Sequence, residues 1–167
     1  KNDGQILEVG VGTGQITLPF AKRGYSILGL ELGLNLADHA RKHLQTYPNV
    51  TIEQADFETW NSETTFDLLL SAQAFHWINI EQGLKQTLRF LKPSGVVALV
   101  WNLDESHHTD FNKATQPIYK KYIPKLPNRP TPITGYTQYK AALEAHPLFE
   151  NLSEYSVSWQ KTHSKED

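Results

Sequence analysis

The stretch Ile6–Arg23, ILEVGVGTGQITLPFAKR, decides how this chain folds. It opens with an apolar run, places Gly10, Gly12 and Gly14 at alternate positions, and continues as an amphipathic segment that ends at Gly24. This order predicts a buried strand, a tight turn and a helix. Glycine lets the backbone adopt positive φ and come close to a ligand, and the free N–H groups of a helix start attract an anionic or polar group. The stretch therefore predicts a ligand site, with a turn that binds nothing as the alternative.

The spacing of the glycines distinguishes two classes of nucleotide site. A dinucleotide fingerprint, G-x-G-x-x-G, requires its third glycine at position 15, where this chain has Gln15. The pattern present is Glu8-x-Gly10-x-Gly12-x-Gly14. Gln15 at the position of the third glycine therefore disfavours a nicotinamide-dependent oxidoreductase.

Length and composition limit the remaining classes of protein. A chain of 167 residues fits one domain, and a net charge of −2 gives no basic surface for nucleic acid. The absence of Cys excludes disulfides and Cys-ligated metal sites. No apolar run reaches the length of a membrane span, and no signal-peptide core is present. We expect a cytoplasmic protein that binds neither nucleic acid nor membrane; these properties leave the oligomeric state open.

Apolar runs alternate with segments of helical periodicity along the first hundred residues. After the opening unit we expect strands at 26–30, 50–52, 66–71 and 96–101, and a turn at 92–95. Helices are expected around 36–44 and after Asn79, which is a suitable N-cap. Pro19 lies inside the first expected helix and predicts a late start or a kink. The alternation predicts an α/β fold, a Rossmann-like doubly wound, mainly parallel sheet with helices on both faces.

The chain changes character after Asn102. Helices are expected at 109–122 and 137–145, on either side of a proline-rich loop, and residues 152–159 alternate like a strand. We expect one domain over 1–167, in which 102–150 forms a helical, proline-rich lid over an acceptor pocket. The aromatic residues that would form this lid, apart from those in the core, are Phe111, Tyr119, Tyr122, Tyr136 and Tyr139.

Acidic residues close the second and third expected strands. Ligands of open parallel sheets bind at the carboxyl ends of the strands. Glu31 is placed there to accept hydrogen bonds from a ribose diol, and Asp56 to accept from an exocyclic amine, with Phe57 against the base. For Asp56, an N-cap of the segment that starts at Glu58 is an equal alternative.

These motifs, together with Leu91-Lys92-Pro93-Ser94-Gly95, resemble the class I S-adenosylmethionine-dependent methyltransferases. The segment Ser71-Ala72-Gln73-Ala74-Phe75-His76-Trp77 is similar to the small-molecule branch (methyltransferase type 11) that includes trans-aconitate methyltransferase-like enzymes. The resemblance implies S-adenosyl-L-methionine as cofactor, and these binding positions: Gly10–Gly14 for its methionine part; Glu31 for the ribose; Asp56 and Phe57 for the adenine; Ala72 and Gln73 beside the sulfonium. Glu8 and Leu32 are two further expected cofactor-binding residues.

The same resemblance implies parts that this chain lacks. The helix that commonly precedes the first strand is absent, and so is the final antiparallel strand of the sheet. The chain contains no Met, and Lys1 lies just before the first strand. We therefore expect a fragment of the usual domain.

Methyl transfer from a sulfonium is an in-line displacement that depends chiefly on alignment of donor and acceptor. We expect a small-molecule acceptor, by analogy a carboxylate or hydroxyl compound. His76 is the candidate base, although a His hydrogen-bonded in the packing beside Trp77 is the more common situation. A metal site at Asp104, His107, His108 and Asp110 is disfavoured against a solvated loop, so no metal is expected. A domain that binds the cofactor without catalysis is the other alternative.

Overall fold

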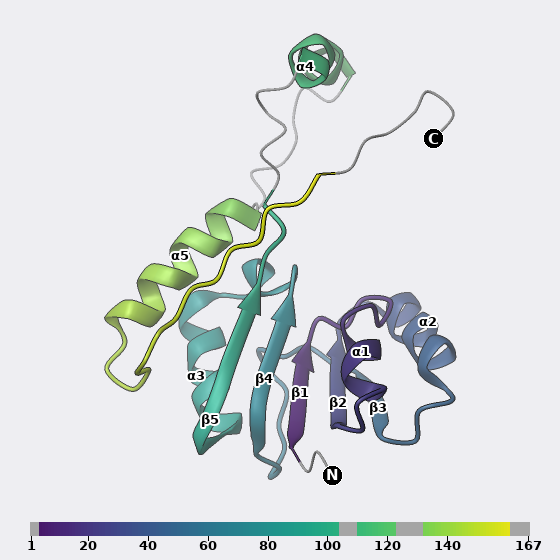
Figure 1. Cartoon of the computed structure of the whole chain (residues 1–167), viewed down its shortest axis with the longest axis vertical. Helices are drawn as coiled ribbons and strands as arrows, with labels where there is room; N and C mark the ends of the chain where they lie inside the picture. Colours follow the sequence, from purple (N-terminus) through teal and green to yellow (C-terminus); the bar gives the residue numbers. More distant parts are fainter. Residues whose placement is uncertain (1–3, 104–109, 123–131, 161–167) are drawn as a thin grey trace.

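A computed structural model describes residues 4–103, 110–122 and 132–160 of the chain. Its centre is a parallel five-stranded sheet in the order β3-β2-β1-β4-β5 (Figure 1). The strands are nearly continuous apolar runs because both faces of a parallel sheet are covered. They are β1 (Gln5–Val9), β2 (Ser26–Glu31), β3 (Val50–Gln54), β4 (Phe66–Ala72) and β5 (Leu91–Val100).

Helices cover both faces of the sheet, as the alternation of elements predicted. On β1, Leu7 and Val9 belong to the large core on one face, whereas Ile6 packs in a cluster on the other. The large core takes in residues of α3 (Ile80–Phe90) and α5 (Pro132–Ala145). The opposite face is covered by α1 (Thr17–Ala21) and α2 (Leu34–Leu44). The doubly wound arrangement is therefore confirmed.

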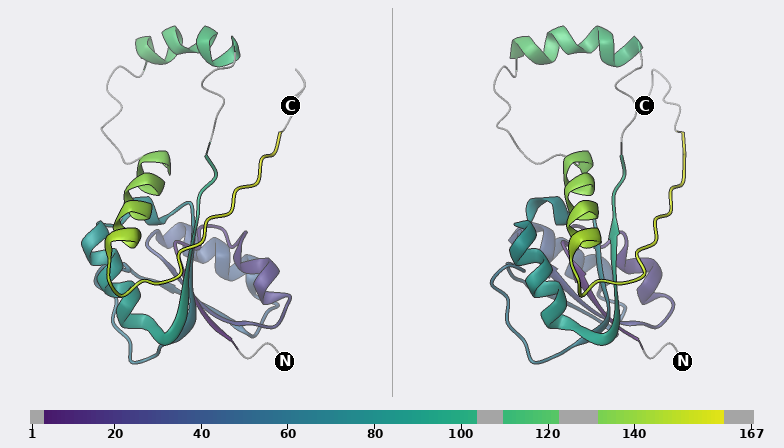
Figure 2. Two further views of the ribbon diagram at one scale, coloured as in Figure 1. Left: turned by 60° about the vertical axis from the view of Figure 1, so that its left-hand side comes forward. Right: turned by 90° about the vertical axis from the view of Figure 1, so that its left-hand side faces the viewer.

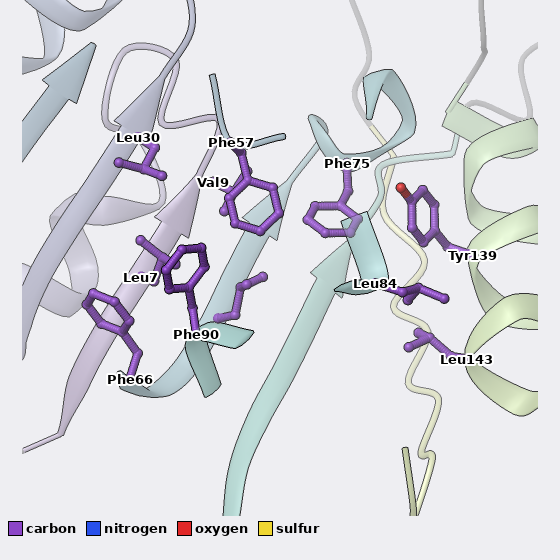
Figure 3. Packing of buried hydrophobic residues seen from close by; sticks show 11 residues of the cluster. Leu7, Val9, Leu30, Phe57, Phe66, Phe75, Leu84, Phe90, Tyr139 and Leu143 are labelled. Carbon is purple, nitrogen blue, oxygen red and sulfur yellow. The ribbon is translucent and has the colours of Figure 1, made fainter. Parts of the chain in front are cut away.

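Aromatic rings link the large core to the edge of the sheet where the ligand site was expected. Figure 3 shows Phe57, Phe75 and Tyr139 side by side over the core face of the sheet, near the carboxyl ends of the strands. The ring centroid of Phe75 lies 5.9 Å from that of Phe57 and 4.9 Å from that of Tyr139. Phe75 belongs to a short 3-10 helix, η1 (Phe75–Trp77), that follows β4. The core thus fixes η1 between the sheet and α5.

The first helix begins late, as Pro19 predicted. Residues 12–16 form turns, and α1 starts only at Thr17. Pro19 therefore lies in the first turn of the helix, where backbone N–H groups have no partner within the helix and a missing N–H costs little. The expected N-cap of α3 is also present, since Asn79 Oδ1 accepts a hydrogen bond from Gln82 N at 3.1 Å.

Two expectations about strands differ from the structure. The turn expected at 92–95 is a register shift within β5, which pairs with β4 through Leu91 and again from Val96 onward. Residues 152–159 form no strand: they run as an extended, exposed segment beside α5, to which Glu154 is joined through Lys140 and Tyr136. Alternating apolar residues form a strand only where a neighbouring strand offers its hydrogen bonds, and none does so here among the described residues.

The remaining helix, α4 (Asp110–Tyr122), lies apart from the sheet, beyond its carboxyl edge, in both views of Figure 2. Its Tyr122 side chain is exposed, whereas Tyr139 of α5 is buried in the core. The proline-rich loop expected between these helices lies outside the described residues. No helix in the described ranges is long and apolar enough to cross a bilayer.

Candidate functional site

The glycine turn adopts a conformation that only glycine accepts readily. Gly10, Gly12 and Gly14 have φ values of +76°, +59° and +84°, in the left-handed region where a Cβ is strained. A Cβ on Gly10 would also lie 2.2 Å from Ala74 Cβ, so the turn is packed directly against the segment that leaves β4. A Cβ on Gly12, in contrast, would meet no atom within 4 Å. The turn therefore offers open space above Gly12.

Glu31 holds this turn in place. Its Oε2 accepts a hydrogen bond from Gly12 N at 2.8 Å, and its Oε1 accepts one from Gly33 N at 2.9 Å. The side chain is nearly buried. The acid that closes β2 thus joins the glycine turn to the start of α2. A carboxylate has about four acceptor positions, so Glu31 keeps capacity for a further donor such as a ribose hydroxyl.

Glu8 lies beneath the turn, on β1, and its carboxyl is isolated. The side chain is 1% exposed, and neither of its oxygens has a hydrogen-bond partner among the described residues. Burial raises its pKa to about 7, an effect that the nearby Thr17 hydroxyl partly offsets. The Thr17 hydroxyl lies beside the carboxyl, but the two do not form a hydrogen bond of normal geometry. Glu8 is therefore protonated over much of the acidic range.

The end of β4 carries a strained residue next to the turn. Gln73 is a non-glycine residue at φ +59°, a conformation that costs about 1–2 kcal/mol. Its N–H donates to Val100 O at 3.0 Å, and its side-chain Nε2 donates to Asn102 O at 2.9 Å. These bonds join the exits of β4 and β5. Ala72, half-buried, ends β4 at the same edge as the glycine turn.

The residues expected around the ribose and the adenine differ in their exposure to solvent. Leu32 is an exposed apolar side chain directly after Glu31. Asp56 is exposed, and its Oδ1 accepts a hydrogen bond from Glu58 N at 2.9 Å, so it caps a turn rather than a helix. Phe57 differs from the expectation: its ring is buried between Phe75 and Phe90 and has no open face for a base. Phe57 is therefore a residue of the large hydrophobic core.

His76 is buried in η1 and has an unusual environment. Its ring packs on Trp77, with centroids 5.0 Å apart, and its Nδ1 has no partner among the described residues. The expected alternative, a His hydrogen-bonded in the packing, is therefore not seen at this atom. Burial lowers the pKa of the imidazole below its ordinary value, so the ring is neutral near pH 7.

Sequence reasoning missed the residues that hold η1 in place. A Cβ on Gly135 of α5 would lie 2.1 Å from His76 Cβ, and Tyr139 OH donates to Ile78 O at 3.1 Å. Both contacts join segments that are far apart in the chain. No sequence signal pointed to Gly135, because the helix was expected only from residue 137, whereas α5 begins at Pro132. Of the disfavoured metal site, positions 104–109 lie outside the described residues; Asp110 pairs with Lys113 at 3.6 Å.

Comparisons with known proteins point to a single protein family. Residues 6–95, more than half of the chain, match the family model described as a methyltransferase domain. A methyltransferase-like protein of Schizosaccharomyces pombe is 36% identical over 99 residues, which are 58% of this chain and 38% of that protein. A trans-aconitate 2-methyltransferase of Methylobacterium nodulans is 29% identical over 147 residues, which are 84% of this chain and 56% of that enzyme.

Solved structures show the same fold at lower identity. The glycopeptide N-methyltransferase MtfA, complexed with S-adenosylhomocysteine, has a TM-score of 0.56 and 23% identity, over 65% of this chain and 50% of that one. The chain spans 38–49% of the length of the first three curated relatives. The matched region contains the glycine turn, Glu31 and the β4 exit, and the chain belongs to the methyltransferase domain family.

Proposed function

We propose that this chain is the cofactor-binding part of an enzyme that transfers a methyl group from S-adenosyl-L-methionine to a small-molecule acceptor. The observation that carries the proposal is the glycine turn, with open space above Gly12 and with Glu31 bracing it from the next strand. A relative that is 29% identical to this chain is named a trans-aconitate 2-methyltransferase, and a structural neighbour was solved with S-adenosylhomocysteine.

The residues present fit such a cofactor. The space above Gly12 admits a ligand to the backbone, and Glu31 retains acceptor capacity at a position suited to a ribose diol. Leu32 adds an exposed apolar surface beside it, and Asp56 an exposed carboxylate. Ala72 and Gln73 border the turn at the β4 exit. When bound, the cofactor supplies an electrophilic methyl group on a sulfonium.

The protein's contribution to the reaction is alignment. Holding two reactants in line is worth up to about 7–11 kcal/mol of the barrier, and the strained Gln73 backbone is a rigid element for that purpose. His76, neutral near pH 7 and without a partner at Nδ1, is the proposed base where the acceptor must lose a proton. The segment 102–150 is the proposed lid, since α5 already packs on η1.

The test uses a matched pair of glycines. Gly12 and Gly24 both have positive φ, and at both positions a Cβ would meet no atom within 4 Å. An Ala substitution therefore causes similar strain at each, but only Gly12 belongs to the turn. In calorimetric titrations with S-adenosylhomocysteine we expect micromolar binding to the native chain and to Gly24→Ala, and at least about a 10-fold loss for Gly12→Ala.

NADH serves as the control ligand in the same titrations. Binding of NADH in place of S-adenosylhomocysteine would overturn the proposal in favour of an oxidoreductase. Equal affinity of the two glycine variants would remove the turn from the binding site. A domain that binds the cofactor without catalysis is distinguished by turnover with a panel of acceptors. Two acceptor classes enter that panel: carboxylate or hydroxyl compounds, as the family resemblance implies by analogy, and amines, because the glycopeptide enzyme among the structural neighbours is named an N-methyltransferase.

A further inference from the structure

A histidine of α2 makes a hydrogen bond to the glycine turn. His43 lies in the last turn of that helix, and its Nδ1 is 2.8 Å from Thr13 O, 30 positions earlier in the chain. A carbonyl oxygen only accepts hydrogen bonds, so Nδ1 carries the proton and donates it to this bond. Thr13 stands between Gly12 and Gly14, and the bond therefore reaches the centre of the turn.

The packing of α2 explains why His43 reaches this position. The next residue, Leu44, is buried in the cluster that also contains Val11 and Ile52. A Cβ on Gly14 would lie 2.8 Å from Leu44 Cδ1 and 3.5 Å from His43 Nδ1. The end of α2 is thus in direct contact with the turn, and the core beneath it places the imidazole.

Two side chains from different elements each hold one peptide group of the turn. Glu31 Oε2 accepts a hydrogen bond from Gly12 N, which fixes the peptide group that enters Gly12. His43 donates to Thr13 O, which belongs to the next peptide group but one. Gly14 N is part of that same peptide group and donates to a carbonyl of the turn at 3.0 Å. The peptide between Thr13 and Gly14 is therefore held at both its oxygen and its nitrogen.

These bonds matter because glycine does not restrict the backbone by itself. Glycine adopts positive and negative φ about equally readily, so the peptide groups beside Gly12 and Gly14 rotate at low steric cost. The positive φ values of both residues are thus one of several conformations that the sequence of the turn permits. One ordinary hydrogen bond changes the population of such a conformation by about 2- to 12-fold.

From this geometry we infer that His43 is a positioning residue of the cofactor site. Its Nδ1–H holds the Thr13 carbonyl and thereby keeps the glycine turn in the conformation that a ligand meets. This inference rests on the proposed methyltransferase function and adds a second support to the one that Glu31 provides. His43 acts through Thr13 O and has no part in the methyl transfer itself.

His39 provides a matched control on the same helix. It lies one turn before His43, and the two ring centroids are 6.4 Å apart. Both side chains are exposed and border a hollow of about 500 Å³. Within the described part of the chain, only His43 of this pair bonds to the turn. Because both rings are exposed, their substitution removes little packing from the core, and the variants should fold.

The first test determines which ring nitrogen of His43 carries the proton in the native chain without cofactor. Long-range 1H–15N NMR distinguishes the two nitrogens at pH 8, where an imidazole is ordinarily neutral. The hydrogen bond that one nitrogen makes sets the tautomer, so we expect a protonated Nδ1 and an unprotonated Nε2. A proton on Nε2 instead would overturn the inference.

The second test measures the affinity for S-adenosylhomocysteine by calorimetric titration. His43→Ala removes the donor and should weaken binding about 2- to 10-fold, because fewer molecules have the competent turn. His43→Asn restores an N–H on the δ atom, the position of Nδ1, and should bind within about 2-fold of the native chain. His39→Ala and His39→Asn make the same changes in helix propensity and should leave the affinity unchanged.

Three results of this titration would overturn the inference: unchanged affinity of His43→Ala, an equal loss for His43→Asn, or a loss of the same size for His39→Ala. If S-adenosylhomocysteine does not bind the native chain, the proposed function fails, and the Gly14 amide resonance still tests His43. We expect this resonance to shift in His43→Ala and to return toward its native position in His43→Asn, because Gly14 N shares a peptide group with Thr13 O. An unshifted resonance would contradict the hold of His43 on the turn.

Discussion

Replacing Glu8 by Gln tests how much stability is lost when the buried Glu8 carboxyl ionises. Glu8 is a carboxyl in the middle of a parallel sheet, 1% exposed and without a hydrogen-bond partner among the described residues. A buried charge without a partner strongly disfavours the folded state, so the group keeps its proton instead. Its pKa accordingly rises from 4.5 to about 7, chiefly because burial removes it from water.

The size and sign of the effect follow from this shift. One unit of pKa corresponds to about 1.4 kcal/mol, so the shift is worth roughly 3 kcal/mol. Below pH 4.5 the carboxyl is protonated in both the folded and the unfolded chain, so its ionisation does not affect stability. Between pH 4.5 and about 7 the unfolded chain releases the proton while the folded chain retains it, so stability falls as pH rises. Above that range the full cost persists.

Urea unfolding at pH 4.5 and pH 8 measures this cost. The amide of Glu8→Gln has no charge to lose, so its own penalty is the same at both pH values. We expect the free energy of unfolding of Glu8→Gln, relative to the native chain, to increase by roughly 3 kcal/mol from pH 4.5 to pH 8. Glu63→Gln, at an exposed position, should show no such increase. A Glu8→Gln difference that does not change with pH would refute the reasoning.

Three further predictions concern the supports of the site. Glu31→Gln leaves one oxygen to accept two backbone N–H bonds, so unfolding should become easier by about 1–3 kcal/mol in urea; unchanged stability would contradict the bracing role. Asn79→Ala removes the N-cap of α3 and should cost about 1 kcal/mol, whereas Asn79→Asp should cost less; equal losses would argue against capping. An NMR titration of the His76 ring should show a midpoint below 6.5, the ordinary value for the group, because burial disfavours the imidazolium. Trp77→Ala should raise that midpoint by admitting water, and a native midpoint at or above 6.5 would contradict the burial argument.

The sheet was predictable because its signals are local. Each strand of a parallel sheet is buried on both faces, so it appears in the sequence as an apolar run, and all five runs form strands. The late start of α1 and the cap at Asn79 follow from properties of single residues, a missing N–H in Pro19 and a side-chain oxygen. The left-handed φ values of the glycine turn follow equally from the glycines themselves.

The features that were not predictable depend on distant contacts. Phe57 reads as an aromatic residue at a strand exit, but Phe75 and Phe90, from later segments, enclose its ring. Residues 152–159 alternate like a strand, yet no described strand pairs with them. The close approach of Gly135 to His76 required the position of α5 relative to η1. Local sequence indicates which residues are candidates for binding a ligand, and only the packing decides which of them a ligand can reach.

The glutamates of the site show most clearly what packing adds. Glu31 accepts hydrogen bonds from two backbone N–H groups, whereas Glu8, without a partner in the described part of the chain, has a pKa that burial raises to about 7. Glu58 is half-buried, and its Oε1 accepts a hydrogen bond from Asn79 N at the start of α3. Three identical side chains thus have three different roles, and only their packing distinguishes them.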